Sequence, residues 1–319
     1  MKTIRFERQG SIGHIVLANP PYNRLDLQFS HCLRDAVHEA SSSDIRALVV
    51  SSEGEDFSFG GDVREWPGKN IDWFRTFVAE VNASYRAFEI LRVPTVAAVR
   101  GVAFGGGFEL ALSCDFLVAA DNAVFRCVEV TTGFIPIAGA LQRLAERVGR
   151  SRASRFAMLG EPISGALAGD LGIATHVVPS SMVEGTAAEL AATLANGPTK
   201  AYAAVRTLLK AWSAGGVPAA DAVMLDITMP LHATEDVTRG FINTAKAFDE
   251  NIEPPAMIFH GRWVPIVISH RQCPTAASDT FPLMSGSARR LPAKSIGIAI
   301  ARFLSRCVIS EREAPSAAR

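Results

Sequence analysis

Short apolar runs alternate with longer amphipathic segments along the first 180 residues of the chain. The short runs have the pattern of buried strands and span residues 12–17, 47–51, 95–100, 116–119 and 123–125. The longer segments have the apolar spacing of helices and span residues 27–40, 73–91 and 138–148. Because such helices connect neighbouring parallel strands, the pattern predicts a layered α/β fold.

From residue 181 onward the strand pattern stops and helical periodicity continues. Glycine and proline pairs separate three expected helices, at residues 182–195, 198–212 and 219–247. The sequence therefore predicts a core at residues 1–195, a helical region at 196–262 and a remainder at 263–319. No repeat of fixed period in the sequence supports a solenoid.

Composition narrows the class of protein. The 319 residues are 48% hydrophobic and have a mean hydropathy of +0.18, which excludes a largely disordered chain. The 32 basic residues balance 32 acidic residues, so the chain lacks the broad positive field of a nucleic-acid binder. Any anion site must therefore be local, and no nucleic-acid partner is expected.

The five cysteines are widely spaced and include no C-x-x-C pair. This spacing disfavours a disulfide framework and a structural zinc site, and it indicates a reducing, cytoplasmic location. Residues 1–10 lack the apolar run of a secretory signal, so none is expected. The apolar stretch at residues 295–310 contains two arginines and is shorter than the roughly 20 residues that span a bilayer, so stable membrane insertion is not expected.

Residues 263–319 differ from the rest of the chain. They contain eight Lys or Arg against three Asp or Glu, with Ser, Ala and Pro between them. One interpretation is a basic segment whose amphipathic part, at residues 296–309, contacts a membrane or a partner. The interpretation that we favour is a poorly ordered appendage, because chain ends lose order most easily.

The most informative segment is PTVAAVRGVAFGGGFELALSCD at residues 94–115. A buried strand leads into Gly105-Gly106-Gly107, and a helix follows. Amides at the start of a helix lack partners within it, and glycine lets a ligand oxygen approach them closely. A second glycine turn, FSFGGD at residues 57–62, has the same character. Each turn alone is more often only a turn, but together they predict two amides that bind one oxygen atom.

Two nucleotide-binding motifs are excluded. Leu110 stands where the third glycine of a dinucleotide-binding fingerprint would be, and no glycine turn is followed by Gly-Lys-Ser or Gly-Lys-Thr.

Two acidic residues accompany the glycine turns. Glu109 falls in the first turn of its predicted helix, where the helix dipole favours a carboxylate whether or not it reacts. Glu129 has apolar neighbours in FRCVEV, and such surroundings tend to keep a carboxyl group protonated. Two carboxylates beside a pair of free amides would form a proton-transfer site.

At these residues the chain resembles the crotonase superfamily, also called the enoyl-CoA hydratase/isomerase family. The resemblance covers residues 4–262. Its motifs are the glycine block at 94–115 together with NPPYNRLD at 19–26, FSFGGDV at 57–63, FRCVE at 125–129, IPIAGALQRL at 135–144 and FHGR at 259–262. The resemblance implies a spiral of ββα turns, a helical trimerisation region, and binding of acyl-CoA thioesters by a homotrimer or a dimer of trimers.

The resemblance also implies catalytic roles. The backbone N–H groups of Gly61 and Gly106 would hold the thioester oxygen as it becomes an enolate. Glu109 would activate water and Glu129 would protonate the α-carbon, and they stand twenty positions apart as in the hydratases of the family. Because addition of water needs both a base and an acid, hydration is favoured. No metal or redox cofactor is implied, and coenzyme A enters as part of the substrate.

Binding roles are implied for Arg24, Phe59, Gly60, Asp62 and Gly105. Arg24 lies in the loop that contacts the nucleotide end of coenzyme A in the family, although a solvated arginine is an equal alternative. Asp62 either caps the following helix or shapes the adenine pocket. Phe59 replaces a small residue, and Ile137 and Ala140 replace glycines, so a bulkier acyl pocket is expected.

Other activities stay open on the same fold. They are double-bond isomerisation, hydration of a cyclic dienoyl-CoA and hydrolysis of an acyl-CoA. A non-catalytic acyl-CoA-binding subunit is the alternative that is not an enzyme.

Overall fold

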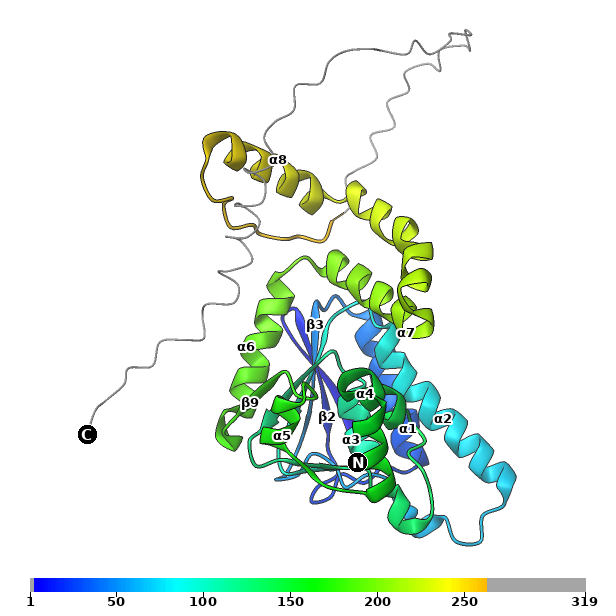
Figure 1. Cartoon of the computed structure of the whole chain (residues 1–319). Coiled ribbons are helices and arrows are strands. Elements are labelled where there is room, and N and C mark those ends of the chain that lie inside the picture. The colour runs from blue at the N-terminus through cyan, green and yellow to red at the C-terminus, as the bar shows by residue number, and fades with distance from the viewer. Residues whose placement is uncertain (1–2, 263–319) are drawn as a thin grey trace, which may run out of the picture. The chain divides into compact units, whose positions relative to one another are not determined.

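The structure, a computed structural model, describes residues 3–262 of the chain (Figure 1). These residues form a six-stranded sheet, a three-stranded sheet and eight α-helices. The predicted basic appendage at residues 263–319, with its amphipathic part at 296–309, lies outside the described residues.

The larger sheet has the strand order β1-β2-β3-β4-β6-β9. Its strands span Ile4–Gln9, Ile12–Leu17, Ala47–Ser52, Thr95–Val99, Phe116–Ala120 and His176–Val178. The β1 strand pairs antiparallel with β2, and every other neighbouring pair in this sheet is parallel. The sequence pattern missed β1 and β9, because β1 is a half-exposed edge strand and β9 has only three residues.

The smaller sheet has the strand order β5-β7-β8. Its strands span Val102–Phe104, Val124–Arg126 and Ile163–Ser164. The chain passes from β4 to β5 and then into helix α3 (Gly106–Leu112), and again from β6 to β7 and then into a 3₁₀ turn, η2 (Glu129–Thr132). These are two ββα turns of the predicted spiral, and they set β5 beside β7 in parallel.

Helices cover the larger sheet on both sides (Figure 1). The helices after α3 are α4 (Ala140–Leu159), α5 (Gly165–Asp170), α6 (Val183–Asn196), α7 (Thr199–Thr228) and α8 (Glu235–Glu250), and those before it are α1 (Leu27–Ser42) and α2 (Ile71–Ile90). Helix α6 packs on the central strands, whereas α1 and α2 pack against each other on the other side. None of the described helices is long and apolar enough to cross a membrane.

The predicted helix breaks at the glycines are present in the structure. The backbone leaves helical geometry at Gly149, with a φ of 77°, and again at Gly215 and Gly216, so α4 and α7 each consist of two helical segments that meet at a kink. The single helix predicted at 219–247 is instead divided, because Thr234 accepts a hydrogen bond from Val237 N and starts α8 as its N-cap. The division of the chain at residue 195 stays a prediction.

The spiral brings α5 so close to the end of β6 that only glycine fits at the first residue of α5. A Cβ atom on Gly165 would lie 1.8 Å from the backbone oxygen of Ala120. We expect Gly165→Ala to lower the free energy of unfolding by about 1–3 kcal/mol, because backbone must move to admit the methyl group. Urea unfolding of the variant at matched protein concentration measures the change.

The matched control is Gly185→Ala within α6, where nothing lies within 4 Å of the added Cβ. This control is expected to raise the free energy of unfolding by about 0.5–1 kcal/mol, because alanine favours helix more than glycine does. Equal unfolding midpoints for the two variants would contradict the close approach of α5 to β6.

Candidate active site

The two glycine turns lie next to each other in space. Ser58 N donates to Val102 O at 3.0 Å and Phe104 N donates to Ser58 O at 2.9 Å, so the segment before the first turn runs beside β5. Gly61 and Gly106 follow these two neighbouring segments at the same end. A Cβ atom built on Gly106 would lie 3.9 Å from Gly61 N. The structure thus brings together the two amides that the sequence singled out.

Both amides are available to a ligand. Among residues 3–262, neither Gly61 N nor Gly106 N donates a hydrogen bond to a protein acceptor. Gly106 is the first residue of α3, so its N–H group has no acceptor within the helix. Both glycines line one cavity of about 230 Å³. That these amides stabilise an oxyanion remains a prediction.

Glu109 lines the same cavity from α3 and is only 1% exposed. Its Oε1 atom accepts hydrogen bonds from Ala138 N at 2.7 Å and from Ala140 N at 3.0 Å. Burial raises the pKa of the Glu109 carboxyl group, while these two amides and the positive charge of Arg143 act in the opposite direction. The carboxyl group is therefore held in place by one oxygen.

Arg143 on α4 supports the loop that holds Glu109. It donates to Ala138 O at 2.6 Å and to Glu89 Oε1 at 2.5 Å. Gly139 lies between the two amide donors with a φ of 102°, a conformation that favours glycine. Arg143 is thus a positioning residue that the sequence pattern missed, because its spacing marks it only as one face of a helix.

Glu129 lines the cavity from the first position of η2, three residues after the end of β7. Burial raises the pKa of Glu129 to about 7, and the negative charge of Glu109 adds to the shift. Its Oε2 atom is buried and has no hydrogen-bond partner among the described residues. Such a carboxyl group keeps a proton near neutral pH and has one oxygen free to exchange it.

Tyr85 is a further residue of the site. It lines the cavity from α2, is 1% exposed, and donates from its hydroxyl group to Gly106 O at 2.8 Å. Burial raises the pKa of Tyr85 well above its ordinary value, so the hydroxyl group stays a donor. Its helical spacing from Phe77 and Val81 could have marked Tyr85 as buried, but only the fold shows that it meets Gly106.

The five predicted binding residues are placed differently. Phe59 and Gly105 line the cavity, and the Phe59 ring packs edge-on against Tyr22 with centroids 5.0 Å apart. Arg24 lies over the same tyrosine, with its guanidinium carbon 4.2 Å from the ring centroid.

Asp62 is an N-cap, as one of its two interpretations predicted. The Asp62 carboxylate accepts a hydrogen bond from the backbone N–H of Arg64 and forms an ion pair with the guanidinium group of Arg64. Gly60 makes the turn at a φ of 82°, where a Cβ atom would lie 2.5 Å from Phe104 O. Of the described residues, Arg24, Gly60 and Asp62 are not in the cavity lining, and their contacts with substrate stay predictions.

Other chemistry near the cavity has little support. Burial raises the pKa of Cys127 to about 12, so this thiol stays protonated and is a poor nucleophile. Within residues 3–262, no group of three His, Cys, Asp or Glu side chains is placed to hold a metal ion. The expectation that no metal is used remains a prediction.

The raised pKa of Glu129 predicts a pH-dependent stability. Folded protein holds this proton up to a pKa of about 7, whereas the unfolded chain releases it near 4.5, so stability falls as pH rises between these values. Glu129→Gln removes the ionisation. We compare the free energy of unfolding of Glu129→Gln with that of wild type at each pH. We expect the difference, variant minus wild type, to be about 2 kcal/mol more positive at about pH 8 than at about pH 5.

Urea unfolding of both proteins at the two pH values measures this difference. The matched control is Glu189→Gln, which removes an exposed carboxyl group from α6. A gain at Glu129 that does not change with pH, or an equal change in the control, would contradict the burial of this acid.

Comparison with known proteins shows which family and fold the chain shares. The family profile described as Enoyl-CoA hydratase/isomerase matches residues 7–254. A probable enoyl-CoA hydratase of Mycobacterium tuberculosis is 34% identical over 181 residues, which cover 56% of this chain and 70% of the relative. A carnitinyl-CoA dehydratase of Proteus mirabilis is 30% identical over 217 residues, which cover 66% of this chain and 82% of that relative.

A solved structure has the same fold as this chain. Enoyl-CoA hydratase subunit I from Geobacillus kaustophilus superposes with a TM-score of 0.73 at 30% identity, over 82% of this chain and 98% of that one. The predicted resemblance and the predicted α/β fold with a C-terminal helical region are therefore confirmed. The chain belongs to the enoyl-CoA hydratase/isomerase family.

Proposed function

We propose that this enzyme adds water across the 2,3 double bond of an acyl-CoA thioester. The observation that carries the proposal is one cavity that is lined by Gly61, Gly106, Glu109 and Glu129. Membership of the family and a relative named as a probable enoyl-CoA hydratase support it.

The glycine amides would bind the reacting thioester. As water adds to the β-carbon, negative charge moves onto the thioester oxygen, and Gly61 N–H and Gly106 N–H can both donate to it. Loss of one such donor typically lowers a rate by about 10²–10³. Tyr85 holds the carbonyl group of Gly106 and so helps to keep this turn in place.

The two acids divide the proton transfers. Glu109 accepts two backbone hydrogen bonds, which favour its ionised form, so it takes the proton from water while the water oxygen bonds to the β-carbon. Glu129 has a pKa of about 7 and gives its proton to the α-carbon. Transfer of one proton between the acids, whose titrations are coupled, restores the starting state.

Double-bond migration is a second candidate. One observation favours it, because Glu109 has an oxygen tied to two amides, whereas Glu129 Oε2 has no partner among the described residues. Glu129 alone could then move a proton between two carbons. The product separates the two reactions, since hydration adds one water to the mass and migration leaves the mass unchanged.

The remaining features are proposals of the same kind. The reaction needs no metal or redox cofactor, and coenzyme A enters with the substrate. A reducing cytoplasm is the proposed compartment, because the cysteines of the described part, Cys32, Cys114 and Cys127, are free thiols.

Removal of either acid tests the mechanism. We expect Glu109→Gln and Glu129→Gln each to lower kcat/KM for an enoyl-CoA by about 10²–10⁴, because each variant loses one proton transfer. The loss of absorbance of the conjugated double bond measures the rate, and mass spectrometry identifies the product. Glu189→Gln on α6 is the control and should keep the wild-type rate. Wild-type hydration by both active-site variants would overturn the mechanism.

Assembly into a homotrimer or a dimer of trimers is also proposed. Several large apolar side chains on α7 and α8 are at least 47% exposed, and six of them are Val205, Leu209, Trp212, Leu225, Phe241 and Ile242. Apolar surface of this extent typically marks a protein interface.

Sedimentation in solution tests the assembly. We expect the wild-type mass to equal three or six chains, because copies of these helices cover one another. The double variant Phe241→Glu/Ile242→Glu should sediment as a smaller species, because charge would enter the interface. Ile90→Glu, an exposed apolar position on α2, is the control and should keep the wild-type mass. A monomeric wild-type protein would refute this proposal.

A further inference from the structure

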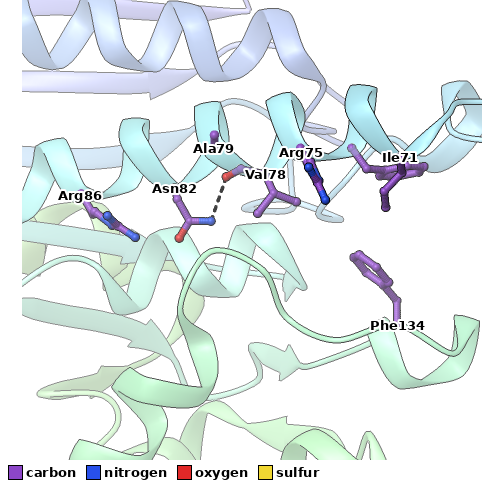
Figure 2. A pocket seen from close by; sticks show the side chains of 8 residues that line it. Ile71, Arg75, Val78, Ala79, Asn82, Arg86 and Phe134 are labelled. Carbon is purple, nitrogen blue, oxygen red and sulfur yellow. Dashed lines mark hydrogen bonds between the residues drawn. The ribbon is translucent and has the colours of Figure 1, made fainter.

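A second hollow of about 610 Å³ runs along α2 (Figure 2). Apart from Phe134, its lining residues all belong to this helix. Figure 2 shows the ring of Phe134 facing the start of α2, near Ile71 and Arg75. We call this hollow the α2 groove.

The α2 groove shares a wall with the cavity of about 230 Å³ at the candidate active site, which we call the catalytic cavity. Phe134 lines both hollows. Asn82 lines the α2 groove and donates to the backbone oxygen of Ile137, which lines the catalytic cavity. The segment from Phe134 to Ile137 therefore separates the two spaces. The Asn82 contact holds one end of this wall, and the ring of Phe134 forms the other.

The sizes of the two spaces indicate which part of a substrate each could hold. The catalytic cavity, at about 230 Å³, is smaller than the roughly 300–1,000 Å³ of typical ligand pockets. The α2 groove is larger, at about 610 Å³, but it is open to solvent, because only one helix and the ring of Phe134 line it. A thioester with a short acyl group fills the catalytic cavity. A longer acyl chain must leave it, and the neighbouring space beyond Phe134 has an apolar wall that includes Phe74 and Val78.

Charge indicates what the far end of such a chain would carry. Arg75 and Arg86 are the charged residues of the groove lining, and no acidic residue lies among them. Neither arginine has an ion pair or a side-chain hydrogen bond within residues 3–262. They are eleven positions apart, about three turns, so both face the same side of α2. Both side chains are exposed, and a guanidinium group there can pair with a carboxylate, with the modest strength of an ion pair in contact with water.

Resting on the proposed hydration, we propose that the α2 groove binds the far part of the acyl chain, and that the preferred substrates are enoyl-CoA thioesters whose acyl chain ends in a carboxylate. Phe134 is then the residue that decides whether a chain passes from the catalytic cavity into the groove.

Matched substrates test the charge preference. The substrates are crotonyl-CoA, a medium-chain 2-enoyl-CoA, and the same medium chain ending in a carboxylate. For wild type we expect kcat/KM to be about three- to fivefold higher with the carboxylate than with the neutral chain, as an ion pair with an exposed arginine would give. Arg75→Gln/Arg86→Gln should lower this ratio to about one. Arg152→Gln, an exposed arginine on α4, is the control and should keep the wild-type ratio.

Two substitutions at Phe134 test the passage between the hollows. The ratio of kcat/KM for the medium neutral chain to that for crotonyl-CoA should rise in Phe134→Ala and fall in Phe134→Trp, because the ring stands between the two spaces.

Three outcomes would overturn the inference. They are equal kcat/KM for the charged and neutral chains in wild type, an unchanged ratio in the double arginine variant, and the same chain-length ratio in both Phe134 variants. If wild type hydrates crotonyl-CoA in any of these cases, the proposed function stands and only the groove assignment fails. If wild type hydrates none of the three substrates, both proposals fail.

Discussion

Pairing of short parallel segments around β5 determines the site. Ser58 bridges to Ala103 on one side of β5, and Phe125 of β7 pairs with Ala103 on the other. Since parallel segments end at the same edge of a sheet, whatever follows each of them is brought together. The residues that come after these segments in the chain are the two glycine turns and Glu129. Three groups that are far apart in the sequence thus line one cavity without any long loop.

Burial of the two acids in this cavity lowers the free energy of unfolding. Burial raises the pKa of both Glu109 and Glu129, which means that the fold excludes water from groups that prefer it. Two backbone amides partly compensate Glu109, whereas the Oε2 atom of Glu129 has no partner among the described residues. A carboxyl group left in this state is typical of a functional site, where stability and activity compete.

Helix α2 lines two spaces because successive residues of an α-helix point in directions about 100° apart. Phe77, Val81 and Tyr85 face the catalytic cavity, and Val78 and Asn82 face the α2 groove. A small rearrangement of the wall at Phe134 would therefore connect two volumes that are already next to each other. Under the proposed substrate class, α2 would contact both the reacting end of the acyl chain and its far end.

The sequence by itself determined the family and the α/β class, and it predicted the four residues Gly61, Gly106, Glu109 and Glu129 that line one cavity, because glycine turns and motif spacing are local features of the chain. Only the tertiary structure decided what surrounds them. The hydrogen bond from Tyr85 to Gly106 spans 21 positions, and the support of the Glu109 loop by Arg143 and Glu89 spans 54. Periodicity can assign a residue to a face of a helix, but the partner on that face depends on how distant segments pack.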